Sequence, residues 1–97
     1  MTKFIEYDIH NGVTQLRVAI MNILHGIVRG EIDKYTCYHL PYSLILDSLI
    51  SIGMHFDCER RTYENYTIRV YNSENKLIMI IDFYNESGEV IFKRNEI

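Results

Sequence analysis

The sequence predicts an α+β fold: two helices followed by a three- or four-stranded antiparallel β-meander, with the helices packed on one face of the sheet. Two observations carry this prediction. Apolar residues recur at helical spacing before Gly53 and at strand spacing after it, and runs of turn residues separate the later apolar stretches. With 97 residues, of which 47% are apolar and 24% charged, the chain is expected to form a single domain over residues 1–97.

The first predicted helix spans Val13–Arg29. Its apolar positions follow the 3.6-residue period and are Val13, Leu16, Ile20, Ile23, Leu24, Ile27 and Val28. The preceding segment His10–Gly12 is predicted to be a break, because Asn-Gly favours positive φ. Gly30 suits a left-handed cap at the end of this helix. The second predicted helix spans Tyr42–Ile52 and ends before a second glycine.

Two further segments flank these helices. The chain from Gly30 to Pro41 is predicted to be a connection, and Pro41 suits the first turn of the second helix, where its missing N–H would be unpaired anyway. The segment Phe4–Ile9 alternates imperfectly and is predicted to be either a short strand, which could join a sheet edge, or a lead-in turn of helix.

The period-two pattern after Gly53 defines the meander. The predicted strands are His55–Arg61, Tyr66–Tyr71, Lys76–Tyr84 and Glu89–Arg94. Four-residue loops would pair Tyr71 with Lys76 and Tyr84 with Glu89. Cys58 reaches the core side only if the loop before Tyr66 has an odd length or a bulge.

The strand pattern divides the sheet into two faces. The side predicted to face the helices gathers Tyr66, Ile68, Val70, Leu77, Met79, Ile81, Phe83, Val90 and Phe92. The opposite side, the outer face, has isoleucines at its centre and charges and tyrosines around them, which is the composition of a protein interface. The candidate partner-binding residues on the outer face are Arg69, Tyr71, Ile78, Ile80, Asp82, Tyr84, Ile91 and Lys93.

Three alternatives exist for what covers the outer face. A second chain could dock on it, the N-terminal segment or a loop could fold over it, or solvent could contact it directly, since much normal protein surface is apolar. Asp82 lies inside the most apolar strand. We interpret it as a charge that limits edge-to-edge aggregation rather than as a catalytic acid.

Histidines and cysteines are the candidates for chemistry. Cys37, His39, His55 and Cys58 lack the C-x2-C spacing that structural zinc sites prefer, so no metal is expected. A Cys–His nucleophile pair from the same residues would need a thiolate, an orienting group and a pocket, none of which the sequence indicates. The glycines are isolated and form no phosphate-binding loop. We therefore expect no catalytic residues and no cofactor.

Charge and hydropathy restrict the partners. A net charge of −3 argues against binding to nucleic acid. A winged-helix regulator is disfavoured because the second helix has no Lys, Arg, Asn or Gln, and the hairpin turns carry Glu74 and Glu86. Apolar stretches fall short of the ~20 residues that span a bilayer, and the N-terminus lacks the apolar core of a signal peptide. A cytoplasmic location with both thiols reduced is the expectation.

The sequence thus predicts a small protein-binding module, able to form a homodimer and without chemistry of its own. Abundant isoleucine, tyrosine and asparagine are typical of AT-rich coding DNA, as in many bacteriophage and mobile-element genes. This adds the hypothesis of an accessory protein that inhibits or adapts a host protein. The alternatives are a winged-helix-like transcriptional regulator, or a small-molecule binder or enzyme. The latter would have its site between the first helix and the sheet, at His25, Tyr35, Tyr38 and His39.

Overall fold

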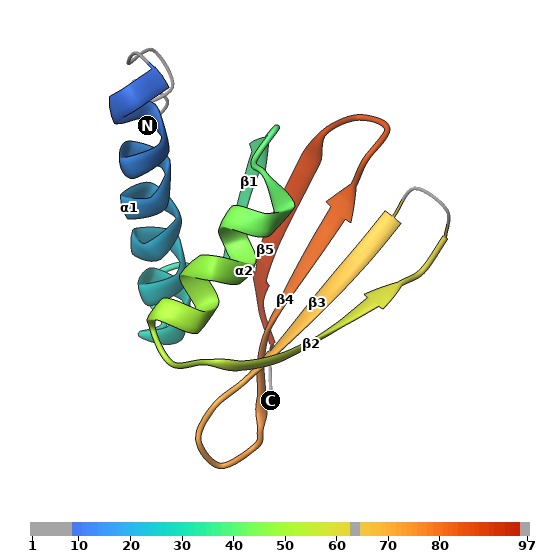
Figure 1. The fold of residues 1–97 in the computed structure, drawn as a ribbon. Helices are drawn as coiled ribbons and strands as arrows, with labels where there is room; N and C mark the ends of the chain where they lie inside the picture. The colour runs from blue at the N-terminus through green and yellow to red at the C-terminus, as the bar shows by residue number, and fades with distance from the viewer. Residues whose placement is uncertain (1–8, 63–64, 96–97) are drawn as a thin grey trace.

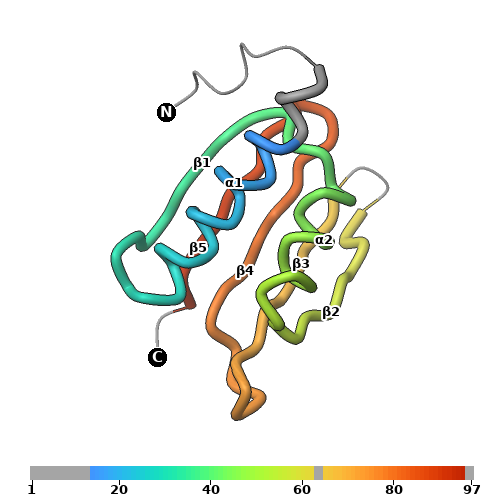
Figure 2. The backbone as a smooth tube through the Cα atoms, turned by 60° about the vertical axis from the view of Figure 1, so that its left-hand side comes forward, coloured from blue at the N-terminus to red at the C-terminus, as the bar shows by residue number. Residues whose placement is uncertain are grey.

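A computed structural model describes the backbone of residues 9–62 and 65–95, and the side chains from residue 14 onwards in those ranges. Its elements are, in order, α1 (Ile9–Val28), β1 (Lys34–Tyr38), α2 (Tyr42–Ser51), β2 (His55–Arg60), β3 (Asn65–Tyr71), β4 (Leu77–Tyr84) and β5 (Glu89–Arg94). The five strands form one antiparallel sheet, and both helices lie across the same face of it (Figures 1 and 2). The α+β class and the β2–β5 meander are confirmed.

The helices are interleaved with the sheet rather than placed before it. The segment predicted to be a connection contains β1, which pairs with β5 and gives the strand order β1-β5-β4-β3-β2. Tyr35 lies opposite Phe92 and Cys37 opposite Val90, and both side chains pack against the core. Only these two residues of β1 point inward. An alternation of apolar and polar residues that is this short does not reveal a strand in the sequence. Long-range pairing with β5 is what makes this segment a strand.

The helix ends follow the glycine chemistry expected of them. Gly30 has a φ of 78°, its N–H donates to the carbonyl of Ile27, and Glu31 N–H donates to the carbonyl of Gly26 at 2.8 Å. This is a Schellman cap, and the same pattern ends α2 at Gly53, where φ is 75°. The predicted caps are confirmed.

The start of α1 differs from the prediction. His10–Gly12, expected to be a break, lies inside the helix, which begins at Ile9. A glycine in a helix costs only about 1 kcal/mol, and once a helix is nucleated further along the chain it extends cooperatively through such a position. Of the segment Phe4–Ile9, residues 4–8 lie outside the described residues.

The core lies between the helices and the sheet. Its fully buried apolar side chains come from both helices and from β3, β4 and β5, and they are Ile20, Leu24, Ile27, Ile45, Leu49, Ile68, Val70, Met79, Ile81, Val90 and Phe92. The same cluster thus joins α1, α2 and the central strands, and both of these helices lie away from the opposite side of the sheet (Figure 1).

The register of β4 with β5 is as predicted, with Tyr84 opposite Glu89, whereas the register of β3 with β4 is shifted by two residues. The turn pairs Asn72 with Lys76 instead of Tyr71 with Lys76, because Asn72 N–H donates to the Lys76 carbonyl at 3.0 Å. A bulge then adds one unpaired residue to β4, between the residues that pair with Tyr71 and Val70 of β3. The turn and the bulge each shift the pairing of β3 with β4 by one residue. A total shift of two residues leaves the β3 side chains on their predicted faces, because side chains alternate with a period of two.

The bulge reverses the prediction for the first two residues of β4. Val70 pairs with Met79 and Tyr71 with Leu77, which leaves Ile78 as the additional residue. Ile78 packs against the core cluster, and Leu77 is not part of that cluster. Ile78 was expected on the outer face and Leu77 in the core; both expectations were wrong, because strict alternation fails at a bulge.

The connection between β2 and β3 fulfils the condition set for Cys58. Arg60 lies opposite Tyr66, so five residues separate the paired positions, and Cys58 lies opposite Ile68. The odd length is confirmed. The Cys58 side chain is nevertheless exposed, because β2 is an edge strand.

We predict that Gly88→Ala destabilises the protein more than Gly53→Ala. Both glycines have positive φ, so alanine costs about 1–2 kcal/mol at either position. A Cβ at Gly88 would additionally overlap the ring of His39, whereas a Cβ at Gly53 would meet no atom within 4 Å. Denaturant unfolding measures the difference. In a His39→Ala background the extra loss at Gly88 should vanish, and equal losses at the two glycines in the native background would contradict this contact.

Candidate protein-binding face

The register places the outer-face residues of all five strands in rows across the sheet. One row runs Thr36, Ile91, Asp82, Thr67 and Glu59, and the next runs Lys34, Lys93, Ile80, Arg69 and Asp57. Each residue in a row is directly opposite its neighbour on the adjacent strand, so their side chains are within reach of one another. The outer face is therefore a continuous surface across the whole sheet.

Asp82 is buried on this face and fully paired. Only 6% of the residue is exposed, and the Thr67 hydroxyl donates to its Oδ1 at 2.9 Å. Lys93 Nζ lies 2.9 Å from Oδ2, and Arg61 lies 3.8 Å from Oδ1 while stacking over the Tyr84 ring at 5.2 Å. The long side chains of Lys93 and Arg61 reach toward the carboxylate, and their apolar stems are suited to cover the surface around it.

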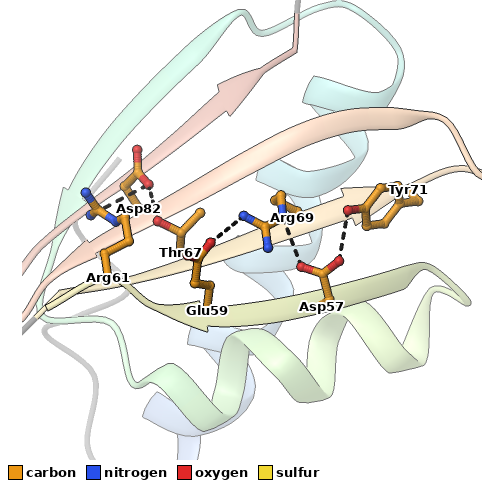
Figure 3. Close-up of polar contacts among 7 residues, drawn as sticks. All are labelled: Asp57, Glu59, Arg61, Thr67, Arg69, Tyr71 and Asp82. Carbon is orange, nitrogen blue, oxygen red and sulfur yellow. Dashed lines mark hydrogen bonds and ion pairs between the residues drawn. The ribbon is translucent and has the colours of Figure 1, made fainter.

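A second polar group occupies the β2–β3 side of the face (Figure 3). Arg69 donates from Nε to Asp57 at 3.0 Å and from a terminal nitrogen to Glu59 at 2.7 Å. The Tyr71 hydroxyl donates to the other oxygen of Asp57 at 2.8 Å. The hydrogen bond with Glu59 is the largest of the causes that raise the pKa of Arg69 above its ordinary value, so the guanidinium is held charged and oriented.

The apolar centre of the face lies between these two groups. Ile80 is opposite both Lys93 and Arg69, and Ile91 is opposite Asp82. Both isoleucines are half-buried although neither α1 nor α2 lies on this side (Figure 1). Within the described residues, ion-paired side chains surround this apolar centre.

Seven of the eight predicted partner-binding residues share this face, and Ile78 is the exception because of the bulge. The prediction omitted the residues that hold the polar groups in place: Asp57, Glu59, Arg61 and Thr67. Asp57 and Glu59 alternate with apolar residues along β2, which could have assigned them to the outer face. No sequence signal indicated that Arg61, just past the end of β2, reaches Asp82.

The four residues considered as zinc ligands do not come together. Cys37 lies on β1 and Cys58 on β2, the two opposite edges of the sheet, which four strand spacings place about 19 Å apart. They cannot share a metal or a disulfide within one chain. Among the described residues, no group of three or more His, Cys, Asp or Glu side chains is arranged to hold a metal ion.

The two cysteines lie in different environments. Burial raises the pKa of the Cys37 thiol to about 11, so it is protonated at neutral pH. Cys58 is adjacent to Tyr42, whose pKa is raised first by burial and then by a hydrogen bond with that thiol. His55 lies opposite Tyr71 and Cys58 opposite Ile68, so these two potential partners belong to different faces of β2.

The four residues considered for the alternative small-molecule site lie in different environments. His25 is exposed on α1, Tyr35 packs on the core and Tyr38 is exposed on β1. His39 lines a hollow of about 290 Å³. The other residues that line it are Leu40, Pro41, Phe83, Tyr84, Asn85, Gly88, Glu89 and Val90. His39 is held there in the left-handed region, with φ of 62°, by its N–H bond to the Gly88 carbonyl.

Helix α2 carries no basic side chain. The core side of α2 consists of Leu44, Ile45, Ser48 and Leu49, and its exposed residues include Ser43, Asp47 and Ile50, without a basic side chain. Within residues 9–62 and 65–95, neither helix has the length and apolar character needed to cross a bilayer.

Comparison of the chain with protein-family models, with curated proteins and with solved structures finds no significant match. The functional interpretation therefore depends on the geometry of this chain.

We predict that Asp82→Ala lowers the free energy of unfolding by about 2–3 kcal/mol, because it leaves the buried Thr67 hydroxyl and the Lys93 ammonium without their acceptor. Asp57→Ala is the matched control. The Asp57 side chain is 50% exposed, so its removal should cost less and its contribution should fade in 1 M salt. Urea unfolding at low and high salt measures both. Equal and salt-sensitive losses would contradict the burial of Asp82.

We also predict that iodoacetamide modifies Cys58 much faster than Cys37 in the folded protein. A pKa of about 11 leaves about one Cys37 thiol in a thousand ionised at pH 8, and that side chain is half-buried, whereas Cys58 is exposed. Peptide mass spectrometry over time gives both rates, and in denaturant the rates should converge. Fast modification of native Cys37 would reopen the nucleophile hypothesis.

Proposed function

We propose that this protein acts by binding another protein through the outer face of its sheet. The observation that carries the proposal is that this face is uncovered by either helix and presents Ile80 and Ile91 within a fixed frame of charged and aromatic side chains. Protein interfaces combine such an apolar centre with a polar rim in which tyrosine and arginine are enriched.

The fixed conformation of the charged side chains around Ile80 and Ile91 favours a binding role. Arg69 is held by two carboxylates, so its conformation is fixed before a partner arrives, and less side-chain entropy would be lost on binding. The mixture of both charge signs supports a protein partner. A nucleic-acid surface would present a basic excess, and here Asp57, Glu59 and Asp82 lie within the same rows as the cations.

The proposal includes the narrower hypothesis of a cytoplasmic accessory protein, encoded by a bacteriophage or another mobile element, that inhibits or adapts a host protein. Composition supports this hypothesis, and the identity of the partner would test it. The winged-helix regulator receives no support from α2, whose exposed side lacks basic residues.

We predict that Ile80→Asp weakens binding of the partner. The new carboxylate would lie opposite Lys93 and Arg69, so the fold should tolerate it while the apolar centre of the face is lost. Immobilised native protein and variants are exposed to an extract of the cells that express the chain. A protein retained in stoichiometric amount is then purified and titrated by calorimetry, where we expect a dissociation constant at least about tenfold higher for the variant.

Ile50→Asp is the matched control, since Ile50 is 64% exposed and belongs to α2, which lies on the other face of the sheet (Figure 2). Circular dichroism melting verifies that both variants fold. Binding that survives Ile80→Asp, or that Ile50→Asp removes instead, would contradict the proposal.

A further inference from the structure

The two edges of the sheet differ in how they are protected. β2 carries Asp57, Glu59 and Arg60 within six residues, a charge density that natural edge strands use to prevent pairing with other chains. β1, Lys34–Tyr38, carries one charge, no proline and no bulge, and 55% of Tyr38 is exposed. Among the described residues, β1 is the edge that lacks these protections against pairing with a further strand.

The hydrogen-bond pattern identifies which backbone groups β1 offers. Arg94 N–H donates to the Asp33 carbonyl at 2.8 Å, and His39 N–H donates to the Gly88 carbonyl at 2.7 Å. In an antiparallel ladder every second residue bonds to the same neighbour, so Tyr35 and Cys37 also bond toward β5. The N–H and C=O groups of Lys34, Thr36 and Tyr38 consequently point away from the sheet.

These three residues are complementary to a second copy of themselves. In an antiparallel pairing with Thr36 opposite Thr36 of the second copy, Lys34 lies opposite Tyr38 in both directions. All three outward-pointing residues then form hydrogen-bonded pairs. A lysine beside a tyrosine ring is a favourable cross-strand pair, and no like charges are directly opposed. On the core side, the half-buried Tyr35 would lie opposite Cys37 of the second copy.

The corresponding antiparallel pairing of two β2 strands about Cys58 is unfavourable. Pairing two β2 strands about Cys58 would place Asp57 opposite Glu59 twice, and directly opposed like charges destabilise a sheet. The Asp57 and Glu59 carboxylates also bind Arg69 in their present positions. In this register charge therefore favours β1 over β2 for self-association.

We propose that two copies of this chain pair through their β1 edges, antiparallel and with the two-fold axis at Thr36, to form one continuous ten-stranded sheet. Lys34, Thr36 and Tyr38 project to the outer face, so the dimer joins the two outer faces into one surface. The inference does not depend on the proposed function, because it uses a different part of the molecule. The contact is small, so the dimer forms at high protein concentration.

Amide hydrogen exchange of the native protein tests the proposal without mutation. Over a concentration series in which sedimentation reports dimer formation, the amides of Lys34, Thr36 and Tyr38 should gain protection of at least about tenfold. The outward-pointing amides of Phe56 and Cys58 on β2 serve as internal controls and should not change. Protection on β2, or none on β1 while a dimer forms, would overturn the proposal.

Thr36→Pro provides the complementary test. Proline is tolerated on an edge strand where the N–H faces outward, and it removes the central hydrogen-bond donor of the contact. We expect its dimer dissociation constant to rise at least about tenfold, with Ser43→Pro, at the exposed start of α2, as a control that leaves it unchanged. A dimer unaffected by Thr36→Pro, or a native protein that is monomeric at millimolar concentration, would overturn the proposal. Should either variant fail to fold, the exchange experiment on the native chain decides.

Discussion

The register of β4 against its two neighbours is the constraint on which the rest of the structure depends. Ile81 and Phe83 enter the core because each lies opposite core-packed residues of both β3 and β5, and Met79 enters it opposite Val70 of β3. A slip of one residue would move all three to the outer face and bury Ile80 and Asp82 under the helices. The turn at Asn72–Lys76 and the bulge at Ile78 each shift the pairing of β3 with β4 by one residue. Together they shift it by two residues, so the core side chains stay on the core face.

This register also explains how a charged residue is accommodated in the middle of the most apolar strand. Asp82 lies opposite Thr67 on one side and beside Lys93 on the other, so its carboxylate receives a hydroxyl and an ammonium while it is removed from water. A buried carboxylate is stable only with such partners. Among the described residues, no buried side-chain nitrogen or oxygen lacks a hydrogen-bond partner. Asp82 is thus an integrated part of the outer face. Our interpretation of it as a charge that limits edge-to-edge aggregation was wrong, because β4 is the central strand of the sheet and the carboxylate is buried.

The two proposed interaction surfaces belong to the same side of the sheet. The outer-face frame around Ile80 and Ile91 lies over β2 to β5, and the side chains of β1 continue it to the edge. A dimer through β1 would present two such frames in a fixed relation, so a partner with two equivalent sites would bind with higher avidity than a monomeric one. Stability and the proposed recognition would be linked, because the ion pairs that cover the face also set the orientation of Arg69 and Lys93.

The sequence alone determined the secondary structure wherever a pattern was long. The helical period before Gly53, the glycine caps and the four meander strands all followed from apolar spacing and turn chemistry, and so did the assignment of seven of the eight outer-face residues. These features are local: their causes lie within a few residues of one another.

What only the tertiary structure decided were features that depend on distant partners. β1 is a strand because β5 pairs with it; Ile78 turns to the core because a bulge fits β4 to β3; and Arg61 covers Asp82 because the hairpin brings them together. The physical reason is the same in each case. A short segment gains too little free energy from its own residues to fix its conformation, and the contacts that fix it come from parts of the chain that folding alone places beside it.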